Sequence, residues 1–182
     1  MSRNNGPWVI NETTLKYRND FIEVNEDRVI RPDGEPGTYA TVDMKAGLAV
    51  LPVGEDRSVY LTRQFRYAIG RESIEVVGGA IDEGEDAEAA ARRELREEVG
   101  IEAGELTPMG VINIDTSIVD GAVSLFLARR LRFTEPDREG TEVIKPLRVT
   151  LDEAVNMVMS GEINQGTSCV LILKAGNYLG AR

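Results

Sequence analysis

The sequence predicts an α/β fold in which a mixed sheet is layered with a few helices, together with a small antiparallel β region at the N-terminus. Strand-like and helix-like segments alternate along most of the chain, as they do in layered α/β domains. A continuous apolar run at 47–53 has the pattern of a strand that is covered on both faces. Short strand-like segments and turn residues fill the first part of the chain, and no Ser/Gly-rich linker follows it. We therefore expect an N-terminal β region at 1–45 and a main domain at 46–182.

Local patterns place the individual elements. The strongest helix signal lies at 86–99, where Ala, Leu, Glu and Arg predominate and Gly100 supplies a stop. Residues 135–141 are polar and contain Pro and Gly, which predicts a loop, and Pro146 interrupts the strand expected next. In order, strands are expected at 21–24, 28–31, 39–44, 47–53, 58–65, 73–77, 110–114, 122–128 and 143–149, and further helices at 151–159 and 168–178.

Composition excludes several kinds of active site. The 182 residues contain no histidine and a single cysteine, Cys169. Nucleophilic sites of the Ser-His-Asp and Cys-His types, zinc or iron sites with histidine ligands, and internal disulfides are therefore ruled out. Acid–base chemistry near neutral pH is left to carboxylates, lysine, tyrosine or metal-bound water.

Charge and apolar pattern restrict the expected partners and location. Asp and Glu number 31 against 21 Lys and Arg, which gives a formal charge of −10. Such an acidic chain is repelled by phosphate backbones and by anionic membrane surfaces, so neither nucleic acid nor membrane is expected as a partner. The lone cysteine favours a cytoplasmic protein, as does the lack of a leader-like or membrane-length apolar run.

Three glutamates converge on the helix predicted at 86–99. Residues three and four apart on a helix are neighbours, so Glu94, Glu97 and Glu98 share one side of it. Carboxylates so close repel one another unless a cation lies among them. Oxygen ligands without His or Cys favour Mg²⁺ or Mn²⁺, and Mg²⁺ completes its shell with water and substrate phosphates. The alternative is a solvated acidic face with no ligand.

The spacing around these glutamates resembles the motif of the Nudix hydrolase family. That motif reads Gly, five residues, Glu, seven residues, Arg-Glu, an aliphatic residue, any residue, Glu-Glu, any residue, Gly and an aliphatic residue. A chance match to it somewhere in the chain is on the order of one in ten million. The resemblance implies an α/β/α sandwich and hydrolysis of a nucleoside diphosphate linked to another group. The matching residues are Gly79, Glu85, Arg93, Glu94, Leu95, Glu97, Glu98, Gly100 and Ile101.

The resemblance also implies a role for each part of the motif. The three helix glutamates would bind the divalent cations, together with the carbonyl of Gly78, for which simple turn geometry is the alternative. Glu85 and Arg93 would pair and hold the loop against the helix. Gly79 would let the chain turn sharply into the motif.

Segments outside the motif are similar to the branch that hydrolyses ADP-ribose and nucleotide sugars. Thr62-Arg-Gln-Phe-Arg-Tyr67 and Ile74-Glu-Val-Val-Gly-Gly79 carry this similarity, as does the N-terminal region. In that branch the N-terminal sheets are exchanged between two subunits, which implies a homodimer. Arg63, Arg66 and Glu75 are the candidates for contacts with substrate, with metal contact a second option for Glu75, against the alternative of ordinary surface positions.

The branch commonly places a catalytic base on a late loop. Glu142 matches that position best, Glu139 competes with it, and Glu97 of the motif is the third candidate. Two departures shift the expected substrate from ADP-ribose toward other nucleotide sugars. Val77-Gly78 replaces the branch's Pro-Ala, and 113–119 lacks the usual downstream proline. Two other functions stay open: a Nudix-fold sensor that binds a nucleotide sugar without hydrolysing it, and a hydrolase of nucleoside triphosphates.

Overall fold

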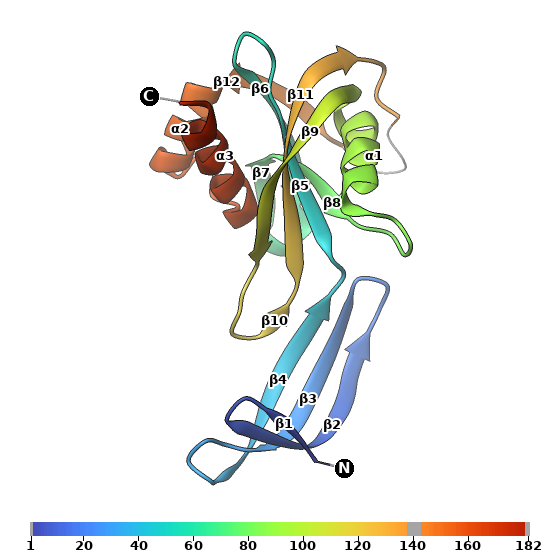
Figure 1. The fold of residues 1–182 in the computed structure, drawn as a ribbon, viewed down its shortest axis with the longest axis vertical. Coiled ribbons are helices and arrows are strands. Elements are labelled where there is room, and N and C mark those ends of the chain that lie inside the picture. The colour runs from blue at the N-terminus through green and yellow to red at the C-terminus, as the bar shows by residue number, and fades with distance from the viewer. Residues whose placement is uncertain (1, 138–142, 181–182) are drawn as a thin grey trace. The chain divides into compact units, whose positions relative to one another are not determined.

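The computed structural model describes residues 2–137 and 143–180 (Figure 1). The chain folds into two compact units. The N-terminal unit comprises Met1–Ala46 and Asn113–Ala122, and the main unit comprises Gly47–Ile112 and Val123–Arg182. The N-terminal unit therefore includes a segment from the middle of the chain.

The strands described in the N-terminal unit form one sheet. Its order is β1-β2-β3-β4-β10, with antiparallel pairing throughout except that β10 runs parallel to β4. Few side chains are buried in it; Ile10, Asp27 and Val29 are among them. The strands are β1 (Arg3–Asn5), β2 (Trp8–Arg18), β3 (Ile22–Ile30), β4 (Pro36–Met44) and β10 (Val119–Asp120).

Among its described residues, the main unit contains two sheets and three α-helices. A four-stranded sheet has the order β8-β5-β11-β9, and a three-stranded sheet has the order β12-β6-β7. The first is mixed, because β5 runs parallel to β11 and antiparallel to β8. The elements are β5 (Gly47–Pro52), β6 (Ser58–Arg66), the 3₁₀ turn η1 (Tyr67–Ile69), β7 (Arg71–Glu75), β8 (Val77–Ala80), α1 (Ala87–Val99), β9 (Ile101–Asn113), β11 (Ala122–Phe133), β12 (Lys145–Thr150), α2 (Leu151–Ser160) and α3 (Gly166–Leu179).

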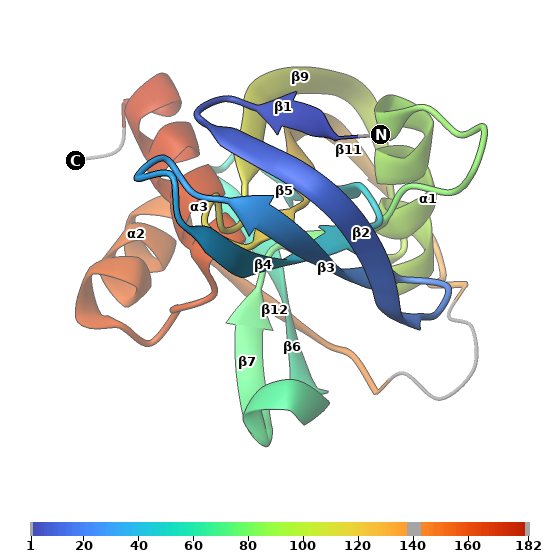
Figure 2. The same ribbon diagram turned by 90° about the horizontal axis from the view of Figure 1, so that it is seen from below.

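Strand β5 lies between two hydrophobic cores, as its continuous apolar pattern predicts. Leu48 and Val50 belong to a core that they share with α1. Ala49 and Leu51 belong to a second core, which includes side chains of α2, α3 and the three-stranded sheet. Figures 1 and 2 show α1 on one side of the four-stranded sheet and α2 and α3 on the other. The predicted α/β sandwich with a mixed sheet is therefore confirmed.

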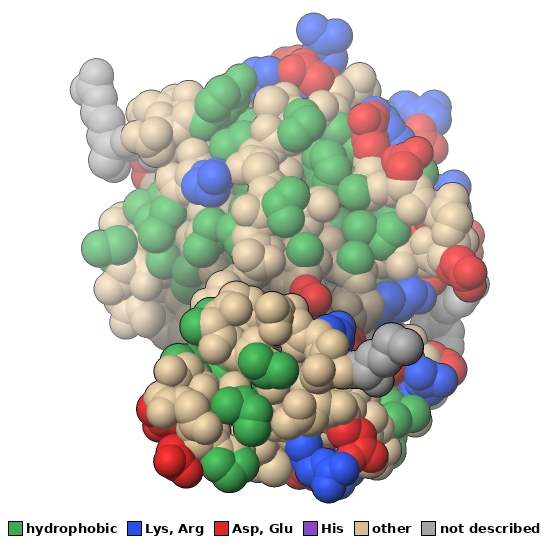
Figure 3. All heavy atoms as spheres, turned by 60° about the horizontal axis from the view of Figure 1, so that its bottom comes forward, with side chains coloured by type: hydrophobic (Ala, Val, Ile, Leu, Met, Phe, Trp, Pro, Cys, Tyr) green, Lys and Arg blue, Asp and Glu red, His purple; other side chains and the backbone are tan. Residues whose placement is uncertain are grey.

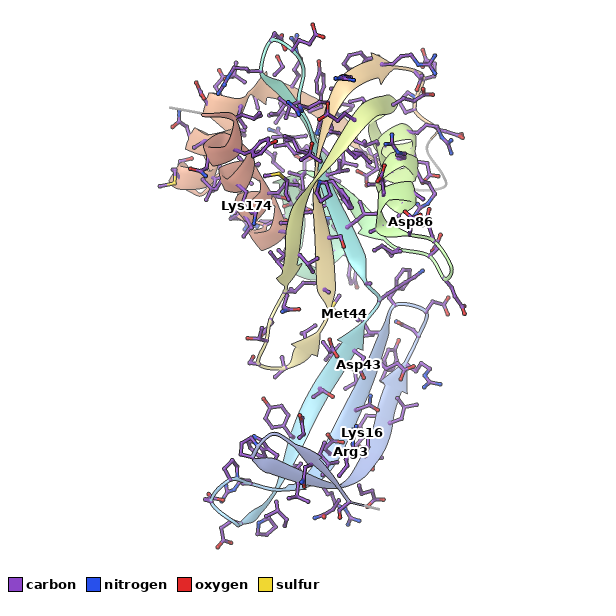
Figure 4. All side chains as sticks on the ribbon, in the orientation of Figure 1. Arg3, Lys16, Asp43, Met44, Asp86 and Lys174 are labelled. Atoms are coloured by element: carbon purple, nitrogen blue, oxygen red, sulfur yellow. The ribbon has the colours of Figure 1, made fainter. Side chains whose placement is uncertain are left out.

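Capping residues define where the helices begin and end. The carboxylate of Asp86, which is labelled in Figure 4, accepts a hydrogen bond from the Ala89 N–H and starts α1. Gly100, with φ of 63°, ends it. Thr150 and Glu153 form a capping box at α2. Within the described part of the chain, no helix has the length and apolar character needed to span a membrane.

Several strands differ from the sequence-based expectation. Strand β2 was not predicted, because Ile10 is its only buried residue and its exposed side chains give no clear alternation. Strand β8 was missed because two of its four residues are glycines. Strand β9 begins at Ile101, nine residues before the predicted start at 110. Pro146 is accommodated because β12 is an edge strand of its sheet.

Candidate active site

Arg93 lies at the centre of the motif, where its guanidinium joins the loop before α1, strand β8 and the helix itself. Its Nε and Nη2 donate to the two carboxylate oxygens of Glu85 at 3.1 and 3.0 Å. Nη2 also donates to the Ala80 carbonyl at 3.1 Å. Nη1 donates to Glu94 at 2.8 Å and to Glu97 at 3.1 Å. The predicted pair of Glu85 and Arg93 is thus present, and it forms part of a larger network.

This network changes the protonation equilibria of its members. Hydrogen bonds from Arg93, with a smaller contribution from the Asp82 N–H, hold the pKa of the Glu85 carboxyl below its ordinary value of 4.5. Hydrogen bonds to Glu85, and then to Glu94 and Glu97, raise the pKa of Arg93 above its ordinary value. Glu85 therefore stays ionised and Arg93 stays charged across the physiological range.

Gly79 has a different role from the one that the sequence predicts. It lies inside β8, paired with Leu48, and it is not among the glycines with positive φ, so the predicted sharp turn is wrong. A Cβ atom on Gly79 would lie 2.1 Å from a carboxylate oxygen of Glu94. The glycine is needed because the Glu94 carboxylate packs directly on the β8 backbone. That contact connects the helix to the strand that carries the Gly78 carbonyl.

The helix glutamates offer the oxygen donors that hard divalent cations prefer. Arg93 holds Glu94 and Glu97 together at one nitrogen, and Glu98, one turn from Glu94, is only 7% exposed. Within residues 2–137 and 143–180, no three acidic side chains already form a cluster with metal-ligand geometry. The donors therefore fit a divalent cation by their chemistry, and Glu94 is placed beside β8 by its packing on Gly79, while Arg93 holds Glu94 and Glu97 in this structure. Their predicted role as ligands stays a prediction.

The predicted substrate residues lie on β6 and β7. Arg66 donates to both oxygens of Glu75, at 3.1 and 2.6 Å, and Glu75 is 6% exposed. Within the described residues, Arg63 has no ion-pair partner, and its side chain is half-buried on β6. The sequence offered no sign of the pairing between Arg66 and Glu75, because their proximity depends on the β6–β7 register.

Two further candidates lie outside the described residues. Glu139 and Glu142, proposed as catalytic bases, belong to 138–142. Sequence reasoning also missed two buried hydroxyl groups of the main unit, those of Thr62 and Ser168, which hydrogen-bond to the backbone beside Glu75. A lone Ser or Thr in an apolar segment carries no signal of such a contact.

Comparisons with known proteins agree with this geometry. The NUDIX domain model matches residues 44–165, and the nucleoside diphosphate sugar hydrolase N-terminal domain model matches residues 8–42. An ADP-ribose pyrophosphatase of Bacillus subtilis is 31% identical over 149 residues, 81% of this chain and 80% of that protein. A GDP-mannose pyrophosphatase of Citrobacter koseri is 33% identical over 134 residues, 69% of this chain and 68% of that protein. A crystal structure of an ADP compounds hydrolase has a TM-score of 0.87 at 19% identity and covers 98% of this chain and 97% of that one, which shows a shared fold.

The pairing of Glu85 with Arg93 predicts a specific pH dependence of stability. Because the folded-state pKa of Glu85 is lowered, its stabilising effect is fully present above pH 4.5 and is lost as pH falls through the folded-state value. Glu85→Gln is expected to lower the free energy of unfolding by about 1–3 kcal/mol at pH 7. Urea unfolding at several pH values should show that the difference from wild type shrinks below pH 4.5. The exposed loop residue Glu83 provides a matched control as Glu83→Gln, and a pH-independent difference for Glu85→Gln would contradict the assignment.

Proposed function

The chain belongs to the Nudix hydrolase family, and on that basis we propose that it hydrolyses the pyrophosphate bond of a nucleoside diphosphate sugar or ADP-ribose. The products are a nucleoside monophosphate and a sugar phosphate. The observation that carries this proposal is the joint match of one chain to the NUDIX domain and to the nucleoside diphosphate sugar hydrolase N-terminal domain. Relatives named ADP-ribose pyrophosphatase and GDP-mannose pyrophosphatase support the substrate class.

Nudix hydrolases generally need a divalent metal, and we propose Mg²⁺ here, with Mn²⁺ able to substitute. Glu94, Glu97, Glu98 and the Gly78 carbonyl would hold it, since these are oxygen donors on or beside the α1–β8 contact. A bound divalent cation neutralises charge on the pyrophosphate and lowers the pKa of water. Arg93 and Glu85 keep the helix and the preceding loop in place while the ion and substrate bind.

The remaining residues would bind substrate and move the proton. Arg63 and Arg66 are proposed to face the diphosphate or sugar. Guanidinium groups form paired hydrogen bonds with phosphate oxygens, and the site is otherwise acidic. Glu75 would orient Arg66 through their paired hydrogen bonds. Glu142 is proposed to accept the proton of the attacking water, with Glu139 and Glu97 as the competing candidates.

We also propose a homodimer in which the N-terminal units, expected at 1–45, are exchanged between subunits. The N-terminal sheet buries few of its own side chains and leaves Leu15, Tyr17 and Phe21 exposed, so it has apolar surface available for a partner. The N-terminal unit also contains a cavity of about 770 Å³, lined in part by Trp8 and Tyr39.

Neither nucleic acid nor membrane is proposed as a partner, and a cytoplasmic location is proposed. The formal charge is −10. Among the described side chains on the face drawn in Figure 3, basic groups are interspersed with acidic ones and form no broad basic surface. The single cysteine, Cys169, is compatible with a reducing compartment.

A product assay tests the proposed reaction. The protein would be incubated with Mg²⁺ and ADP-ribose, ADP-glucose, GDP-mannose, UDP-glucose, dinucleoside polyphosphates or dNTPs, and mass spectrometry would identify the products. We expect nucleoside monophosphate plus sugar phosphate, with turnover lowered at least 100-fold in Glu98→Gln and little changed in Glu88→Gln, an exposed position on the same helix.

Three other results would contradict the proposal. Turnover of dNTPs alone would favour a nucleoside triphosphate hydrolase. Tight binding of nucleotide sugars without turnover would favour a sensor. Full activity in Glu98→Gln would contradict the proposed role of Glu98 as a metal ligand.

The contact between Gly79 and Glu94 predicts a loss of activity without a matching loss of stability. In Gly79→Ala the new Cβ must displace the Glu94 carboxylate, which is the far end of a flexible side chain, so stability should change by less than about 1 kcal/mol. Activity should fall about 10–100-fold, because a proposed metal ligand is moved. Gly166→Ala, where a Cβ meets no atom within 4 Å, is the control. Unchanged kcat/KM in Gly79→Ala would show that the position of Glu94 is unimportant.

A further inference from the structure

The peptide between Glu75 and Val76 connects the two sheets of the main unit. Strand β7 ends at Glu75 in the three-stranded sheet, and β8 begins at Val77 in the four-stranded sheet (Figure 1). Val76 belongs to neither strand and is 5% exposed. Its N–H is therefore a buried donor outside the sheet ladders and needs an acceptor from elsewhere.

Two buried hydroxyl groups bind this one peptide from two different elements. The Thr62 hydroxyl, on β6, donates to the Glu75 carbonyl at 3.3 Å. The Ser168 hydroxyl, on α3, accepts from the Val76 N–H at 3.0 Å. Both Thr62 and Ser168 are 0% exposed. The carbonyl and the N–H of a single peptide plane are thus both fixed by side chains, which restricts rotation of that plane.

Each hydroxyl is itself held by the local structure. Thr62 is paired with Glu75 in the β6–β7 register, so its side chain stays beside that residue. Ser168 lies in the first turn of α3, where the side-chain oxygen of Gln165 accepts from its backbone N–H at 2.7 Å. The cap fixes the first turn of α3, and with it the side chain that reaches Val76.

The fixed peptide lies between two parts of the candidate site. On one side, the buried Glu75 carboxylate accepts hydrogen bonds from Nε and Nη2 of Arg66. On the other side, strand β8 contains Gly78, whose carbonyl is a proposed metal ligand. It also contains Gly79, on which the Glu94 carboxylate packs. A rotation of the Glu75–Val76 peptide would change the direction of both segments relative to each other.

We propose that Thr62 and Ser168 are positioning residues, which set the substrate-side residue Glu75 and the metal-side Gly78 carbonyl relative to one another by clamping the peptide between them. This inference rests on the function proposed above, which assigns those two sides. Side chains that do not bind the metal themselves but orient its ligands commonly change metal affinity or activity by about 10–100-fold when they are removed. A purely structural pair of hydrogen bonds would change stability alone.

Four variants separate these two roles. Ser168→Ala removes the acceptor and keeps a good helix former, and Thr62→Val removes the donor with little change of shape. Thr62→Ser restores a hydroxyl and serves as the rescue. Val59→Ala, a 0% exposed core position on the same strand as Thr62, destabilises the core without touching the peptide.

The main readout is Mn²⁺ binding in the absence of substrate, measured by electron paramagnetic resonance. The temperature is chosen so that urea unfolding shows each variant to be folded. Backbone NMR of Gly78 and Gly79 is the second. We expect Ser168→Ala and Thr62→Val to weaken Mn²⁺ binding on the order of ten-fold and to shift both glycine amides. Thr62→Ser should bind within about two-fold of wild type, and Val59→Ala should bind as wild type does despite its lower stability.

The outcomes distinguish this inference from the proposed function. Wild-type Mn²⁺ affinity and unshifted glycine amides in Ser168→Ala and Thr62→Val would overturn the positioning role, whatever the substrate panel shows. Weakened Mn²⁺ binding in Val59→Ala equal to that in Thr62→Val would also overturn it, because stability alone would then explain the effect. If Ser168→Ala and Thr62→Val lose Mn²⁺ affinity while wild type hydrolyses no compound of the substrate panel, the positioning role stands and the proposed reaction fails.

Discussion

The guanidinium of Arg93 is the interaction on which the rest of the candidate site depends. It is a half-buried cation that binds Glu85, Glu94, Glu97 and the Ala80 carbonyl at once. These partners come from the loop, the helix and strand β8, so one side chain joins three segments. The carboxylates compensate the guanidinium for its lost hydration, and the guanidinium reduces the repulsion between two neighbouring glutamates. Arg93 therefore restricts the positions of the loop residue Glu85 and of two helix glutamates, Glu94 and Glu97.

The backbone that faces this network is equally constrained. Helix α1 packs closely on strand β8 because Gly79 has no side chain. Along one edge, β8 is paired with the buried apolar strand β5. The chain enters β8 through the Glu75–Val76 peptide, which Thr62 and Ser168 bind. The helix and the strand are thus held in place by different contacts. Those of the helix are ionic and partly exposed, and those of the strand are neutral and buried. Salt and low pH should act mainly on the first.

The sequence predicts the local parts of this arrangement well. The α1 helix and its stop at Gly100 follow from residue composition and the glycine. The pair of Glu85 with Arg93, which joins the loop to the helix, is implied by the resemblance to the Nudix motif. The core strand β5 follows from its apolar run. Motif resemblance adds the family, which the comparisons confirm.

Features that depend on tertiary contacts could not be predicted in the same way. Strand β8 has two glycines among its four residues: a Cβ on Gly79 would meet the Glu94 carboxylate of α1, and a Cβ on Gly78 would meet the Leu48 carbonyl of β5. The pairing of Arg66 with Glu75 depends on the register of two strands. The bond from Val76 to Ser168 joins residues 92 positions apart, and no local pattern encodes it.

Anomalous diffraction from crystals containing Mn²⁺ and a non-hydrolysable ADP-ribose analogue would test most directly whether the glutamates organised by Arg93 are the metal site. The account predicts manganese peaks beside the carboxylates of Glu94 and Glu98, with Arg93 still bound to Glu85. Manganese bound elsewhere, or an ordered analogue at the α1 glutamates with no manganese beside them, would contradict it.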